Sequence, residues 1–161
     1  MIIFDDVKKL LKHNNLSYSS KVLNKPWGGF YYINDNLSRD FLNIFFDSSF
    51  SEKLDLKSKL SPKILIIKPN KRLSWQYHKR RSEIWSVIKG NILVSISEND
   101  NEGDQIKLKA KDQIEIGKKI RHRIIGTDDY ALVAEIWIHT HKKNPSDEND
   151  IIRLQDDFNR N

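Results

Sequence analysis

Four side chains that can bind a divalent metal ion fall in two short stretches of the chain. The stretch LSWQYHKRRSEIW has the pattern Q-x-H-x4-E and contains Gln76, His78 and Glu83, and the later stretch KKIRHRI contains His122. Together they offer two imidazoles, a carboxylate and an amide oxygen, a ligand set that suits zinc, iron or manganese. A metal ion held in this way could polarise a substrate oxygen as a Lewis acid.

Strand alternation indicates how these side chains could meet. Alternate residues of a strand point to the same face, so Gln76 and His78 should share one face, and Glu83 and Trp85 should share a face of the next strand. If the two strands pair as a hairpin, the first three ligands converge inside a barrel, and His122 in a later strand completes the set. The alternative is that each histidine is a core or surface residue without a metal.

The second half of the chain predicts the barrel that such ligands need. From residue 64 onward it consists of eight short apolar segments separated by turn residues, for example at Gly90-Asn91 and in GTDD. The segments are ILIIK, LSWQYH, EIWSVIKG, NILVSIS, QIKLKA, QIEIG, HRIIG and YALVAEIWIH. This spacing is typical of a small all-β barrel or sandwich and not of βαβ units.

The first half of the chain predicts helices and one strand. Residues 5–13 place apolar side chains on one helical face, with acidic residues early and basic residues late, as the helix dipole favours. A turn at Gly28-Gly29 should lead into a strand over residues 30–33. The segment NLSRDFLNIFFDSSF predicts a second helix, with Ser38 as its N-cap.

Length and composition favour one domain. The chain has 161 residues, of which 38% are hydrophobic, and this is close to the commonest domain size. We expect a single domain over 1–161, with an N-terminal extension at 1–60, a core barrel at 61–140 and a tail at 141–161 whose IIRLQDDF segment docks on the barrel. Cysteine is absent, which excludes disulfides, thiolate metal ligands and cysteine nucleophiles.

The net charge of the chain indicates which kinds of partner it can bind. The net charge of +6 favours anionic partners such as phosphorylated metabolites. Lysine is spread along the chain and no nucleic-acid-binding motif accompanies it, so we expect no nucleic-acid partner. No segment approaches the ~18 apolar residues of a transmembrane helix, and Asp5 and Asp6 interrupt the apolar start. We therefore expect a cytoplasmic protein with no membrane partner.

Three segments resemble a known family. KPNKRLSWQYHKRRSEIWSVIKGNILV, KKIRHRI and DENDIIRLQDDFNR are similar to the cupin module of type II mannose-6-phosphate isomerases, which also occurs as short stand-alone chains. The resemblance covers residues 24–33 and 60–160. It implies an all-β cupin double-stranded β-helix, a jelly-roll barrel, with short N-terminal helical additions.

The resemblance also implies an activity. It points to aldose–ketose isomerisation of a sugar phosphate, foremost mannose 6-phosphate to fructose 6-phosphate. Isomerisation of another phosphosugar such as a heptose phosphate, or a non-catalytic metal-containing cupin that binds a sugar phosphate or related anion, stays open. Many members have three consecutive histidines where this chain has the sequence HKR. The two replaced histidines are not among the metal ligands, so metal binding should be retained, and the difference bears on the choice of substrate.

In the family that this chain resembles, four residues of this pattern bind a divalent metal, usually zinc. The resemblance implies that their counterparts here are Gln76, His78, Glu83 and His122. The arginine two positions before the glutamate is implicated in activity, and here it is Arg81. Iron or manganese could replace zinc in such a ligand set.

The remaining candidate residues follow from their positions. Glu135 lies on a predicted strand and could act on substrate if it faces inward, whereas facing outward it would be an ion-pair partner. We expect Arg81, Lys79 and Trp85 to contact the substrate. The segment 37–63 is expected to serve packing or dimerisation, and we expect a homodimer.

Overall fold

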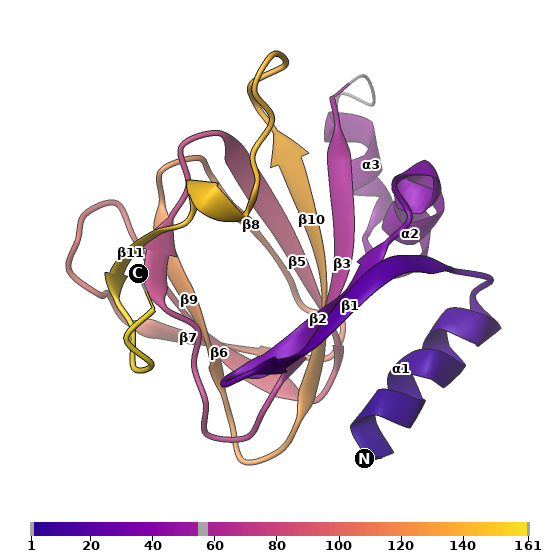
Figure 1. Ribbon diagram of the computed structural model, residues 1–161, viewed down its shortest axis with the longest axis horizontal. Coiled ribbons are helices and arrows are strands. Elements are labelled where there is room, and N and C mark those ends of the chain that lie inside the picture. The colour runs from indigo at the N-terminus through magenta and orange to yellow at the C-terminus, as the bar shows by residue number, and fades with distance from the viewer. Residues whose placement is uncertain (1, 55–57, 161) are drawn as a thin grey trace.

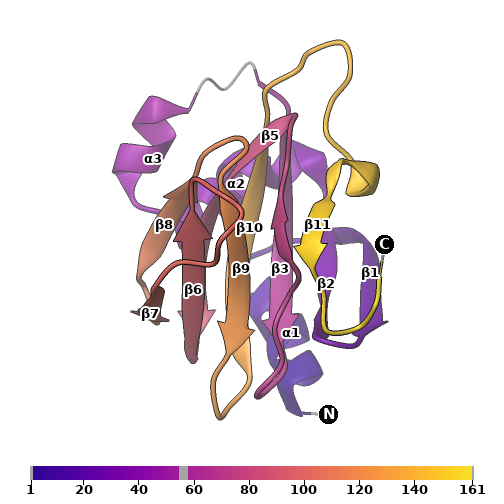
Figure 2. The same cartoon turned by 90° about the vertical axis from the view of Figure 1, so that its left-hand side faces the viewer.

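The protein consists of two antiparallel sheets that face each other. The computed structural model describes residues 2–54 and 58–160. Figure 1 looks down between the two sheets, and Figure 2 shows the smaller sheet from its outer side. The all-β architecture expected from the sequence is confirmed.

The larger sheet has six strands and the smaller has five. The order in the larger sheet is β1 (Tyr18–Lys25), β2 (Gly28–Ile33), β3 (Leu60–Ile67), β10 (Ala131–His139), β5 (Arg81–Lys89) and β8 (Gln113–Ile116). The order in the smaller sheet is β11 (Ile152–Gln155), β4 (Trp75–Tyr77), β9 (Arg121–Gly126), β6 (Asn91–Ser97) and β7 (Gln105–Lys109). Strands β3 to β10 correspond to the eight predicted segments.

The α-helices of the described residues lie on the outer side of the larger sheet (Figure 1). They are α1 (Ile2–His13), α2 (Ser38–Phe45) and α3 (Ser48–Lys53), with short 3-10 turns η1 (Asp35–Leu37) and η2 (Glu148–Asp150) elsewhere in the chain. Val7 and Leu11 of α1 and Phe41 of α2 are buried against this sheet. Burial of each such side chain contributes roughly 1.5–3 kcal/mol to folding.

Alternation along β3 separates two apolar cores. Ile64 and Ile66 pack with the helices on the outer face, whereas Leu65 and Ile67 belong to a second cluster between the sheets. Lys63 has the same parity as Leu65 and Ile67, so its side chain also enters the space between the sheets.

The second predicted helix differs from the structure in two respects. Ser38 is the first residue of α2 and not its N-cap, and its hydroxyl donates to the backbone oxygen of Asp35 at 2.6 Å. The helix also ends early, because Phe46 has an extended backbone and α3 starts afresh at Ser48. The segment 37–63 thus forms α2, α3 and the start of β3, apart from residues 55–57, which lie outside the described residues.

The C-terminal tail adds a strand to the smaller sheet. Strand β11 extends the smaller sheet by pairing with β4, so that Arg153 lies opposite Gln76 and Ile152 opposite Tyr77. Figure 2 shows this strand at the edge of the smaller sheet. Among the described residues, no helix is both long and apolar enough to span a bilayer.

Candidate metal centre

Three of the predicted ligands form a tight buried cluster. The ligand atoms of His78, Glu83 and His122 all lie within 4.8 Å of one another. The Nε2 atom of His78 is 3.2 Å from Nε2 of His122 and 3.2 Å from Oε1 of Glu83. The Nε2 atom of His122 is 3.6 Å from Oε2 of Glu83. All three side chains are almost fully buried.

The cluster is assembled from both sheets. His122 lies on β9 directly opposite Gln76 of β4, and His78 follows β4 in the smaller sheet. Glu83 lies on β5 in the larger sheet, where it pairs with Trp137 of β10. The predicted hairpin is therefore wrong: the strands that carry His78 and Glu83 belong to different sheets, and the ligands meet across the barrel.

Backbone carbonyls fix the protonation of both histidines. Nδ1 of His78 is 3.0 Å from the oxygen of Asp150, and Nδ1 of His122 is 2.8 Å from the oxygen of Ile120. A carbonyl oxygen can only accept, so each Nδ1 carries a proton, and in the neutral tautomer Nε2 presents its lone pair to the cluster. Burial lowers the pKa of His122 to about 4, which keeps it in the neutral form that binds metals.

The donor set fits a divalent metal. Two imidazole nitrogens and a carboxylate converge, and a positive charge offsets their mutual repulsion; Arg81 supplies one such charge, and a bound cation would supply another. The outer nitrogen of each histidine is hydrogen-bonded to a carbonyl, as is usual for metal-bound histidine. Nitrogen and oxygen donors of this kind suit zinc, iron and manganese.

Gln76 lies beside this cluster. It is directly opposite His122 in the sheet and lines the cavity described below. Its Oε1 atom accepts a hydrogen bond from the Ser74 hydroxyl at 2.5 Å. Ligation by Gln76 therefore stays a prediction.

Arg81 contacts two of the ligands directly. Its Nε donates to Oε1 of Glu83 at 2.7 Å, and its Nη2 is 3.1 Å from Nε2 of His78. The guanidinium stacks on the Trp137 ring at 3.5 Å and donates to the Ser146 hydroxyl at 2.9 Å. Arg81 is buried at the start of β5, so these contacts hold Glu83 and His78 in place.

Glu135 faces inward and lies next to Glu83. The indole N–H of Trp85 is 3.2 Å from Oε2 of Glu83 and 3.2 Å from Oε1 of Glu135, so the two carboxyl groups share one donor. Burial and the negative charge of Glu83 raise the pKa of Glu135 to about 8. A carboxyl group with a pKa near neutral pH can both take and return a proton.

Lys63 is a site residue that the sequence analysis did not identify. It is 2% exposed, lies opposite Glu135 in the sheet, and its ammonium is 3.0 Å from Oε1 of Glu148 and 3.3 Å from the centre of the Trp137 ring. Burial lowers the pKa of Lys63. A lysine at the inward parity of the apolar strand LSPKILII was the available signal.

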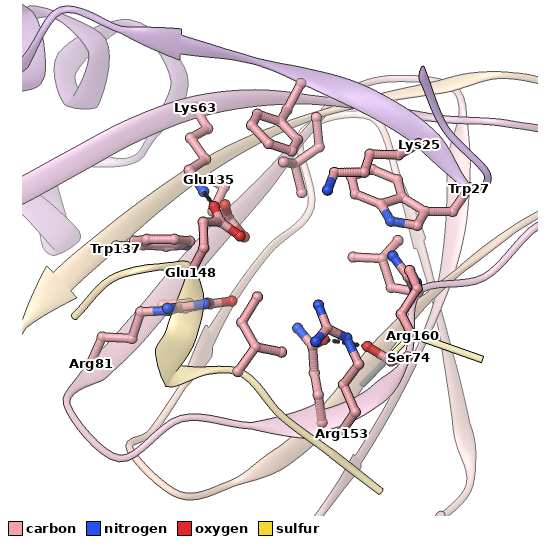
Figure 3. Close-up of a pocket in the computed structure, with 16 residues that line it drawn as sticks. Lys25, Trp27, Lys63, Ser74, Arg81, Glu135, Trp137, Glu148, Arg153 and Arg160 are labelled. Carbon is pink, nitrogen blue, oxygen red and sulfur yellow. Dashed lines mark hydrogen bonds and ion pairs between the residues drawn. The ribbon is translucent and has the colours of Figure 1, made fainter. Parts of the chain in front are cut away.

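These groups surround a cavity between the sheets. In Figure 3, Lys63, Arg81, Glu135 and Glu148 lie on one side, and Lys25, Arg153 and Arg160 project from the opposite side. Five cationic and three acidic side chains line it, which are Lys25, Lys63, Arg81, Arg153 and Arg160, and Glu83, Glu135 and Glu148. The cavity is therefore suited to an anionic ligand.

Two predicted substrate contacts lie elsewhere. The side chain of Lys79 is exposed and is not among the described residues that line the cavity, and its backbone N–H donates to Oδ1 of Asp150 at 3.1 Å. Trp85 is buried, and its indole N–H donates hydrogen bonds to the carboxyl groups of Glu83 and Glu135. It supports the site from behind and is not a lining residue.

Comparison with known proteins points to the same region. The model of the family described as "Mannose-6-phosphate isomerase C-terminal" matches residues 34–156, which include the His–Glu–His cluster, Arg81 and Glu135. No match was found among curated proteins.

Solved structures of oxalate decarboxylase from Bacillus subtilis have a similar fold. The structure at pH 4.6 is 16% identical with a TM-score of 0.59, and a single-residue variant is 16% identical with a TM-score of 0.60. In both, the likeness covers 84% of this chain and 30% of that chain, so this chain spans less than a third of the other's length. At this identity the likeness concerns the fold alone, and it confirms the cupin double-stranded β-helix.

Proposed function

The chain belongs to the mannose-6-phosphate isomerase C-terminal family, and we propose that it is a metal-dependent isomerase that interconverts mannose 6-phosphate and fructose 6-phosphate. The observation that carries this proposal is the buried cluster of His78, Glu83 and His122 beside Glu135 in a cavity with excess positive charge. Metal ligands, a proton-transferring group and an anion-binding wall are the three parts that aldose–ketose isomerisation of a phosphosugar needs.

The metal ion would be held by His78, Glu83 and His122, with Gln76 as a fourth ligand. Such an ion, when bound, supplies Lewis acidity that stabilises negative charge developing on the C1 and C2 oxygens of the sugar. Arg81 acts as a positioning residue here, because its hydrogen bonds to Glu83 and His78 fix the direction of both ligands.

Glu135 is the proposed base. It takes the proton from C2 of the open-chain aldose, and the C–H electron pair forms the C1–C2 double bond while the C1–O π pair moves onto its oxygen. The proton is then returned to C1, where the double-bond pair forms the new C–H bond as the C2 oxygen becomes the carbonyl. A second proton passes from the C2 hydroxyl to the C1 oxygen, so the reaction neither consumes nor releases a proton. The Lys63 ammonium favours the ionised form of Glu135, while burial and Glu83 oppose it, and this balance keeps the group able to do both steps.

A coupled assay on zinc-loaded protein tests this function. We expect mannose 6-phosphate to be converted to fructose 6-phosphate, and we expect Glu83→Ala to lose both bound zinc and turnover. Turnover that survives in zinc-free Glu83→Ala would contradict the metal-dependent mechanism.

Thermal shift measurements with sugar phosphates separate the alternatives. A binding protein without activity would be stabilised by mannose 6-phosphate without converting it. Turnover of a heptose phosphate but not of mannose 6-phosphate would retain the chemistry and change the substrate.

A further inference from the structure

The wall of the cavity opposite Glu135 is basic and is assembled from distant parts of the chain. Lys25 ends β1, Arg153 lies on β11, and Arg160 follows β11 in the tail. All three line the cavity, and Figure 3 shows their nitrogen atoms directed toward its centre.

The strand pairing in the smaller sheet fixes the position of Arg153 relative to the metal centre. Arg153 lies directly opposite Gln76, which in turn lies opposite His122. Residues opposite one another in an antiparallel sheet point to the same face, so Arg153 enters the cavity in one row with Gln76 and His122. The basic wall therefore adjoins the metal centre.

Like charges are brought close together on this wall. Burial and the positive charge of Arg160 lower the pKa of Arg153, while the negative charges of Asp156 and Glu148 oppose this shift. Arg160 also pairs with Asp156, with Nε 3.0 Å from Oδ2, but Asp156 does not line the cavity. The acidic residues that do line it, Glu83, Glu135 and Glu148, contact Arg81, Trp85 and Lys63 on the other side.

We propose that Lys25, Arg153 and Arg160 form a phosphoryl-binding subsite that holds one end of the substrate while its C1–C2 end lies at Glu135. A phosphoryl group carries up to two negative charges on a compact set of acceptor oxygens, and arginine guanidinium groups bind such oxygens in pairs. Trp27 and Phe30, whose rings stack 6.2 Å apart, line the cavity beside Lys25 and provide an apolar surface for the sugar carbons. The identity of that sugar rests on the proposed function, whereas the phosphoryl class rests on the basic wall.

Two of the three residues lie outside the segment matched by the family. The match covers residues 34–156, so it includes Arg153 but neither Lys25 nor Arg160. The subsite therefore depends on the β1–β2 hairpin and on the end of the tail.

Calorimetric titration with inorganic phosphate tests the subsite directly. We expect binding to chelator-treated protein, since the subsite does not need the metal, and at least a tenfold loss of affinity in Lys25→Gln and in Arg160→Gln. The matched control is Lys107→Gln, which removes the same charge from an exposed position on β7 and should leave affinity unchanged. Lys25→Gln keeps the test valid if Arg160→Gln loosens the tail through Asp156.

The results separate this subsite from the proposed function. No phosphate binding to the wild type, equal binding in all variants, or binding only in the presence of metal would each overturn the subsite. In the isomerase assay, the two variants should raise KM for mannose 6-phosphate with little change in kcat, because the phosphoryl contact is the same in ground and transition states. If phosphate binds through Lys25 and Arg160 while the zinc-loaded protein converts no mannose 6-phosphate, the function fails and the subsite stands.

Discussion

At the scale of single residues, Glu135 carries the sharpest prediction. Glu135→Gln keeps the shape of the side chain and its hydrogen bond from Trp85 but cannot take up a proton. Turnover should fall about 10²–10⁴-fold, while bound zinc and the affinity for inorganic phosphate stay at wild-type values. Paired assays of metal content, phosphate binding and kcat measure this, and retention of more than a tenth of wild-type kcat would remove Glu135 from the role of base.

At the scale of elements, strand alternation predicted which side chains face inward but not which strands are neighbours. The parity of Gln76, His78, Glu83 and His122 was right. The pairing was wrong, because the turn after His78 crosses between sheets, and nothing local distinguishes this crossing from a hairpin. Strand β1, with the sequence YSSKVLNK, was missed because it is polar and largely exposed, so it shows little apolar alternation.

The tail shows a second limit of sequence-based prediction. Its docking on the barrel was predicted from apolar residues, but Glu148, Asp150 and Arg153 reach the site through contacts that span more than 70 positions in the chain. For example, Glu148 accepts from Tyr32 at 2.6 Å. Such long-range polar contacts leave no periodic signal.

The junction of β10 with the tail predicts a pH dependence. Nδ1 of His139 accepts the Ser146 backbone N–H at 2.9 Å, and its Nε2 lies 2.8 Å from the Ser61 hydroxyl. Protonation of Nδ1 would break its hydrogen bond with the Ser146 N–H. Burial lowers the pKa of His139 to about 4, whereas the pKa of a histidine in an unfolded chain is ~6.5. The unfolded state therefore binds the proton more tightly than the folded state does. The stability that neutral His139 contributes is complete above pH ~6.5 and is lost as the pH falls toward 4.

Urea unfolding between pH 4 and 7 measures this effect. In His139→Gln the slope of the unfolding free energy against pH should be smaller than in the wild type by up to ~1.4 kcal/mol per pH unit within that window. His13→Gln, at the exposed end of α1, is the control and should follow the wild type. Parallel curves for His139→Gln and wild type would show that His139 does not titrate differently on folding.

At the scale of the whole molecule, the metal centre joins the two sheets. His78 and His122 come from the smaller sheet and Glu83 from the larger one, so a bound ion bridges the layers that enclose the cavity. Because unfolding separates these ligands, metal binding must stabilise the folded chain. At a zinc concentration about 100 times Kd, the gain is ~2.7 kcal/mol, which corresponds to a rise in Tm of roughly 5–10 °C for a domain of this size.

Calorimetry of zinc-loaded and chelator-treated protein measures this rise. In His78→Ala the rise should vanish together with bound zinc, because the ion would then have only one imidazole and the Glu83 carboxylate from the cluster. His141→Ala, which changes an exposed histidine beyond the end of β10, should keep the full rise. An equal rise in His78→Ala would place the stabilising ion elsewhere, and the cavity between the sheets would then be held together by its side chains alone.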